Sequence, residues 1–168
     1  MNTITKQMWL ALVCVLMFSS CTKDTDLSEE NAAIKTADLV DYVTYSKIET
    51  EILKAVNDHR ASKGLSVLKK VDGITFLAAD HNDYMIQNKN VSHDNFSQRY
   101  TTLVNTIGAK SVSENIAFGY RSSEAVMKAW LNSEGHRGNL EGNFTHFGIS
   151  VSQDEEGKNY FTNIFARR

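Results

Sequence analysis

Three short clusters of polar residues contain the side chains of this chain that are best suited to chemistry. They are Ser92–Phe96, Ser113–Ala117 and Ser133–Leu140, and their titratable members include His93, Glu114 and His136. Imidazole and carboxylate groups can ligate zinc and can transfer protons. We predict that the three clusters meet in one cleft, although His93 and His136 are more than forty positions apart.

Local spacing alone does not assemble a site from these residues. The chain has no HExxH pair, no GxSxG elbow, no phosphate-binding loop and no GxGxxG motif. His93, His136 and His146 fall in predicted loops or at strand starts, where functional groups are often placed. The glycines on either side of His136 predict a backbone that can approach a partner closely. A shared site must therefore be built by the fold.

The length and composition fit a single globular domain with its own core. The chain has 168 residues, of which 42% are hydrophobic and 23% are charged. Its formal net charge of -2 gives no basic footprint for nucleic acid, so nucleic acid is not an expected partner. The chain contains no proline, so its turns must be made by Gly, Asn, Asp and Ser.

The first residues have the pattern of a targeting segment. Lys6 precedes the apolar run Met8–Phe18, which is too short to span a bilayer and typical of a signal-peptide core. Small residues then lead to Cys21, an order that resembles the lipobox of bacterial lipoproteins. We predict a signal peptide over 1–20, lipidation at Cys21, and a polar tether over 21–46. The alternative is an ordinary secretory signal with a chance cysteine.

The only cysteines are Cys14 and Cys21. Cys14 would be lost with the signal peptide and Cys21 would be capped by lipid. We therefore expect no disulfide and no cysteine nucleophile in the mature domain, which must be stabilised by its core. The predicted location is the bacterial cell envelope, outside the cytoplasm, as a monomer anchored to a membrane through Cys21.

Hydrophobic periodicity predicts the main elements of the domain. Helices are expected over 47–63, 72–88, 98–107 and 124–132, and two strands within 143–152 and 160–165 form a hairpin. His59 and His81 lie on the apolar faces of the first two helices, where we expect hydrogen-bonded core residues rather than ligands. The rest of 90–120 shows no clear period.

Six motifs in order resemble those of the CAP superfamily (cysteine-rich secretory proteins, antigen 5 and pathogenesis-related 1 proteins), in its bacterial SCP-like branch. The resemblance covers about residues 48–165. The motifs are Leu53–Arg60 with Gly64-Leu65, Ser92-His93, Glu114–Ala117, Trp130–Leu140, Phe144–Gly148 and Asn163–Phe165. The resemblance implies a CAP/SCP domain over 47–168 with an α+β fold, a three-layer α-β-α sandwich around a central antiparallel sheet.

The resemblance also implies a cleft lined by two histidines and two acidic residues, which in some members holds zinc or another divalent ion. His93 matches the first histidine, Glu114 the first acid and His136 the second histidine. The second acid of the animal pattern lies three residues after Trp130, where this chain has Ser133, and Glu134 follows one residue later. His146 matches no position of this set.

Asn115 and Asn139 are then expected to hold loop backbones through their side-chain amides. Trp130 is expected in the core.

Three functions remain open at this stage. We favour a non-enzymatic binding module whose cleft takes a metal, a small ligand, a lipid or a protein. The second is a metal-dependent hydrolase with His93 and His136 on zinc and Glu114 as general base. The third is an adhesion or interaction domain whose cleft is vestigial.

Overall fold

The structure, a computed structural model, describes residues 43–168. The predicted signal peptide over 1–20, Cys21 and most of the tether lie outside the described residues. No helix within residues 43–168 is long and apolar enough to cross a membrane. The sheet and two hydrophobic core clusters are built from described residues, so this part of the chain forms one folded unit.

Five helices and four strands make up the described domain. In chain order they are α2 (Lys47–Ser62), β1 (Lys69–Lys70), α3 (Asp72–Asn88), α4 (Phe96–Ile107), β2 (Ser111–Phe118), α5 (Ser123–Asn132), α6 (Glu134–Glu141), β3 (His146–Gln153) and β4 (Asn159–Arg167). The sheet has the order β1-β3-β4-β2. β2, β3 and β4 pair antiparallel, whereas the two-residue β1 pairs parallel with β3.

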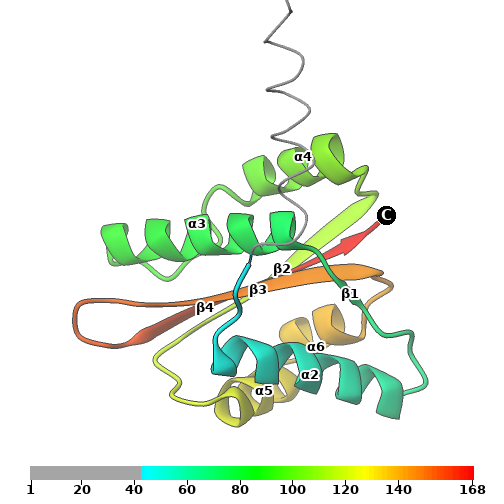
Figure 1. Ribbon diagram of the computed structural model, residues 1–168, viewed down its shortest axis with the longest axis horizontal. Helices are drawn as coiled ribbons and strands as arrows, with labels where there is room; N and C mark the ends of the chain where they lie inside the picture. The colour runs from blue at the N-terminus through cyan, green and yellow to red at the C-terminus, as the bar shows by residue number, and fades with distance from the viewer. Residues whose placement is uncertain (1–42) are drawn as a thin grey trace, which may run out of the picture.

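The helices cover the two faces of the sheet in separate layers, α3 and α4 on one side and α2, α5 and α6 on the other (Figure 1). The predicted three-layer α-β-α sandwich is therefore confirmed. Alternation along β4 sorts the core between the layers, because successive strand residues point to opposite faces. Phe161 and Phe165 pack with α2, α5 and α6, while Ile164 and Ala166 pack with α3 and α4.

Close contact between α3 and the sheet fixes the helix that later carries part of the site. A Cβ atom added at Gly148 of β3 would come within 2.5 Å of the Thr75 backbone nitrogen, so only glycine permits this approach. Asn82 adds two hydrogen bonds across the interface. Its Nδ2 donates to the Ser150 carbonyl oxygen over 2.9 Å, and its Oδ1 accepts from the Thr162 hydroxyl over 2.7 Å.

The expected helices are present, with their ends within a few residues of the predictions. Ser46 caps α2 in a capping box with Glu49, and Ser122 caps α5. One assignment was wrong: the segment around His136 is the helix α6, not a loop. The unassigned region 90–120 contains β2, an edge strand of the sheet.

The described chain begins by packing on the domain. The Val43 backbone N–H donates to Asp72 Oδ2 over 3.4 Å, and the Tyr45 hydroxyl lies 2.6 Å from Thr75 Oγ1. Burial raises the pKa of Tyr45 to about 12, so the phenol stays protonated. The last residues of the predicted tether are thus part of the folded unit, at the junction of β1 and α3.

Candidate functional site

Glu114 and Asn115 are consecutive residues of β2 and point to opposite faces of the sheet. Glu114 faces the α3–α4 layer and Asn115 faces α6, so the polar residues of this region are arranged around one sheet edge. Side chains from α5 and α6 reach two carbonyl groups of β2. The Glu114 carbonyl oxygen accepts from Asn139 over 3.2 Å, and that of Ile116 accepts from Trp130 Nε1 over 3.1 Å.

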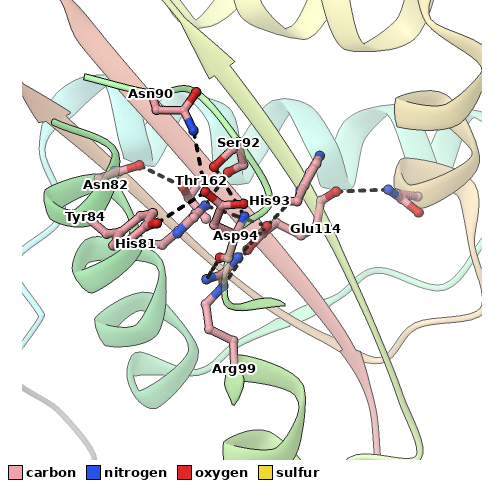
Figure 2. Close-up of polar contacts among 11 residues, drawn as sticks. His81, Asn82, Tyr84, Asn90, Ser92, His93, Asp94, Arg99, Glu114 and Thr162 are labelled. Carbon is pink, nitrogen blue, oxygen red and sulfur yellow. Dashed lines mark hydrogen bonds and ion pairs between the residues drawn. The ribbon is translucent and has the colours of Figure 1, made fainter. Parts of the chain in front are cut away.

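The Glu114 carboxylate is buried, with 1% of its side chain exposed, and basic side chains bind it (Figure 2). Arg99 of α4 binds it with two hydrogen bonds, Nε to Oε2 and Nη2 to Oε1, each 2.8 Å long. His93 Nδ1 lies 2.8 Å from Oε1. Arg99 Nη1 also donates to the Asp94 carbonyl oxygen, which ties the loop that carries His93 to the same guanidinium.

These contacts decide the charge on Glu114. Burial by itself raises the pKa of the carboxyl group, but the hydrogen bonds from His93 and Arg99 and the positive charge of Arg99 outweigh it. The pKa of Glu114 is therefore lowered and the group is an anion at neutral pH. Because the anion accepts a hydrogen bond from His93 Nδ1, the Nε2 atom of that half-exposed ring is left for other partners.

His81 of α3 completes the buried cluster. Its Nε2 donates to the Ser92 carbonyl oxygen over 2.8 Å and lies 3.9 Å from Glu114 Oε1. Burial lowers the pKa of His81, so the ring is neutral and its Nδ1 is an acceptor. The expected hydrogen-bonded core histidine is confirmed, although the sequence did not predict its place beside Glu114.

His136 belongs to α6, in the layer on the other side of the sheet edge. Its carbonyl oxygen accepts from Asn115 Nδ2 over 3.0 Å, and Asn115 Oδ1 accepts from Asn139 Nδ2 over 2.8 Å. Burial and then the charge of His93 lower the pKa of His136. The predicted structural roles of Asn115 and Asn139 agree with these bonds.

The glycines near His136 do not act as predicted. A Cβ atom at Gly135 or Gly138 would meet no other described residue within 4 Å, and both glycines have ordinary helical backbone. Close backbone approach is therefore not their role.

The other predicted site residues lie outside this cluster. Ser133 is the N-cap of α6 and is half-buried, and Glu134 is exposed in the first turn, where a carboxylate is favoured by the helix dipole. Within residues 43–168, neither side chain makes a hydrogen bond or ion pair with Glu114, His93 or His136. His146 begins β3 as predicted and bonds Thr145 Oγ1 over 2.8 Å.

A groove opens beside His136, between the second half of β2 and α5. Its volume is about 340 Å³. The lining is mainly apolar and aromatic, with His136 and Ser133 as its polar members; the residues are Ile116, Ala117, Phe118, Tyr120, Ala129, Trp130, Ser133 and His136. The imidazole thus borders a hollow suited to a ligand with an apolar part.

The donor set does not fit a zinc site with three protein ligands. In the described part of the chain, no three His, Cys, Asp or Glu side chains are placed to hold one ion. Both Glu114 oxygens are already engaged by Arg99, and one also by His93. Of the predicted ligands within residues 43–168, this leaves the two imidazoles of His93 and His136, whereas structural and catalytic zinc sites use three or four protein ligands.

Comparison with known proteins assigns the fold to a family. The model of the cysteine-rich secretory protein (CAP) family matches residues 53–165. The chain belongs to the CAP family. This CAP domain is similar in sequence to the Bacillus subtilis (strain 168) membrane protein YlbC, with 32% identity over 126 residues, 71% of the chain and 34% of YlbC. It is 36% identical to YkwD of the same organism over 110 residues, 62% of the chain and 42% of YkwD.

Solved structures place it in the bacterial SCP-like branch. An extracellular SCP-domain protein of Bacillus anthracis is 28% identical with a TM-score of 0.62, over 76% of the chain and 45% of that protein. An outer surface protein of Borrelia burgdorferi has the same fold, with a TM-score of 0.67 at 19% identity over 77% of the chain and 98% of that protein. The CAP chain spans about a third to two fifths of the length of its two Bacillus subtilis relatives.

Proposed function

We propose that this CAP domain is an extracytoplasmic, envelope-anchored binding module that does not catalyse a reaction. The observation that supports this most is the state of Glu114. A general base near neutral pH needs a pKa close to the working pH and a free oxygen. Glu114 has a lowered pKa, is buried, and has both oxygens bound by Arg99. It orients His93 instead.

Binding is proposed at the β2 edge, where the half-exposed His93 ring, His136 and the apolar groove lie around one strand. A small ligand with an apolar part and a hydrogen-bonding group matches this combination. The experiment that tests the proposal assays the chain from Thr22 onward on generic peptide and ester substrates, with and without chelator. No turnover is expected. Turnover that His136→Ala abolishes would replace the binding module with a hydrolase.

Metal binding is a further prediction of the resemblance, and we propose His93 and His136 as its ligands. Zinc or another divalent ion held by two imidazoles should bind more weakly than in sites with three protein ligands. The Glu114 carboxylate would not touch the ion but would orient the His93 ring through its hydrogen bond. Metal affinity should fall as pH falls, because protonated imidazoles cannot bind metal. Because the pKa of His136 is lowered, protonation of this ring should reduce the affinity only below about pH 6.5.

Calorimetric zinc titrations test this prediction. His93→Ala and His136→Ala should each reduce zinc affinity at least tenfold, about 1.4 kcal/mol. His146→Ala is the matched control and should leave it unchanged, because His146 bonds Thr145. Equal affinities in all three variants would contradict a metal at this pair. Ser133→Glu, which restores the acid of the animal pattern, and Glu134→Ala then show which of the two positions can supply a further ligand.

Anchoring through Cys21 is proposed from the sequence and is consistent with the extracellular and outer-surface proteins that share the fold and the membrane protein YlbC. Acyl chains contribute about 0.8 kcal/mol per buried CH₂. Cys21→Ser, placed behind a cleavable secretory signal without a lipobox, should move the protein from the membrane fraction to the soluble fraction. As the control, the Cys14→Ser variant with its native signal should stay in the membrane fraction. Membrane retention of the Cys21→Ser protein would contradict the lipoprotein assignment.

A further inference from the structure

Positive side chains gather at one end of the central sheet. β1, the start of β3 and the end of β4 meet there, since Lys69 pairs with His146 and His146 pairs with Ala166. The Lys110 backbone N–H donates to the Arg167 carbonyl oxygen over 2.7 Å. We call this the basic end; its cationic residues, all exposed, are Lys69, Lys70, Lys110, Arg167 and Arg168.

These charges are not neutralised by other described residues. None of the ion pairs within residues 43–168 involves the five side chains of the basic end. Asp72, which follows β1 closely in sequence, is buried and accepts hydrogen bonds from Val43 and Tyr45. Burial, followed by the charges of Arg168 and Lys69, lowers the pKa of His146, so this ring adds no positive charge near neutral pH.

The opposite end of the sheet carries charges of both signs, unlike the basic end. The β3–β4 turn and the C-terminal end of β4 lie at opposite ends of the sheet (Figure 1). The turn carries Asp154, Glu155, Glu156 and Lys158, and Lys89 at the end of α3 lines the same hollow as this turn. A negatively charged surface would therefore attract the basic end of this molecule more strongly than the opposite end.

The chain that leads to Cys21 enters the domain near the basic end. Val43 bonds Asp72 at the start of α3, and the Lys70 ammonium lies 4.5 Å from the centre of the Tyr45 ring. Val67, just before β1, is 57% exposed, the highest value among the exposed large apolar side chains of the described residues. Cations beside an exposed apolar side chain are typical of surfaces that lie against lipid headgroups.

We propose that the basic end is a membrane-facing surface that binds anionic lipid headgroups and orients the anchored domain. The part about orientation rests on the proposed anchor at Cys21. Residues 22–42 can span at most about 70 Å, so an anchor alone does not fix how the domain faces the membrane. With the basic end against the bilayer, the β3–β4 turn points away from it.

Vesicle binding by the chain from Thr22 onward tests the surface without the anchor. It should bind phosphatidylglycerol vesicles and not phosphatidylcholine vesicles. Each cation near an anionic surface contributes about 1 kcal/mol, or about fivefold in affinity, so Lys69→Gln, Lys110→Gln and Arg167→Gln together should weaken vesicle binding about a hundredfold. The matched control Lys54→Gln, Arg121→Gln and Lys128→Gln changes the same number of exposed charges elsewhere and should bind as the parent does.

Orientation is tested on the full-length lipidated protein in phosphatidylglycerol vesicles. The chain has no cysteine after Cys21, so Val67→Cys and Glu156→Cys each introduce a single labelling site. Spin-labelled lipid should quench a dye at position 67 several-fold more than one at 156. About 1 M salt, where the Debye length is roughly 3 Å, should abolish the difference.

The outcomes separate the two proposals. Equal quenching at both sites, equal vesicle binding by the two triple variants, or tighter binding to duplex DNA than to phosphatidylglycerol vesicles would each overturn the membrane-facing surface. Release of the full-length protein from vesicles by high salt would instead overturn the lipid anchor. In that case the vesicle assay of the unanchored chain would decide whether the basic end binds lipid.

Discussion

Arg99→Met should lower the free energy of unfolding by about 3–5 kcal/mol at neutral pH, the cost of removing one partner from a buried ion pair. Arg99 donates two 2.8 Å hydrogen bonds to a carboxylate whose side chain is 1% exposed. Methionine fills a similar volume but donates nothing. Glu114 would keep only its contact with His93 and would lie beside the neutral His81, as a poorly compensated buried anion.

The loss should depend on pH with a definite sign. In the parent protein the lowered pKa of Glu114 contributes stability that is present above its unfolded value, near 4.3, and is lost as pH falls through the folded value. Without Arg99, burial dominates and the pKa of Glu114 rises above its unfolded value. Protonation of Glu114 then removes the unpaired charge in the variant. The difference in free energy of unfolding between variant and parent should therefore shrink as pH falls from about 7 to about 4.5.

Denaturant unfolding at both pH values measures this difference. Arg121→Met, at an exposed arginine, should stay within about 0.5 kcal/mol of the parent. Adding Glu114→Gln to Arg99→Met removes the unpaired charge and should recover part of the loss at neutral pH. A pH-independent loss, or no recovery in the double variant, would show that Arg99 acts through packing and not through the charge of Glu114.

The structure also shows why sequence reasoning placed some of the site and not the rest. Helical periodicity identified α2, α3 and α5 because each has an apolar stripe against the sheet. β2 has no such signal, since its alternation puts the polar Glu114 and Asn115 on two buried faces. Its burial depends on side chains from α4 and α6, which local sequence does not reveal.

Arg99 was missed although a signal existed. It lies four residues before Leu103 and eight before Ile107, on the inner stripe of α4. An arginine in an apolar stripe is rarely buried without a partner, so this position indicated a buried acid nearby. The partnership of His81 with Glu114 had no comparable signal, because a histidine on a helix stripe does not show which strand it faces. Family motifs supplied His93, Glu114 and His136, and the fold supplied their arrangement around an edge strand.

Trp130→Ala is the second substitution with a large expected effect, a loss of about 3–5 kcal/mol of unfolding free energy. Trp130 is 1% exposed in the core between α2, α5, α6 and the sheet. Its indole Nε1 also donates to the Ile116 carbonyl oxygen on the free edge of β2. Alanine would leave a cavity, expose that edge carbonyl and widen the groove beside His136, which Trp130 lines.

A graded series separates these contributions. Trp130→Phe keeps most of the buried ring but removes the donor, and should cost about 1–3 kcal/mol, since it leaves one partly buried carbonyl oxygen without its partner. Glu156→Ala in the exposed β3–β4 turn is the control and should stay within about 0.5 kcal/mol of the parent. Thermal and denaturant unfolding measure all three. Similar losses for Trp130→Ala and Glu156→Ala would show that α5 does not present Trp130 to the core. A Phe variant as unstable as the Ala variant would show that the hydrogen bond to the β2 edge, rather than ring burial, is what Trp130 contributes.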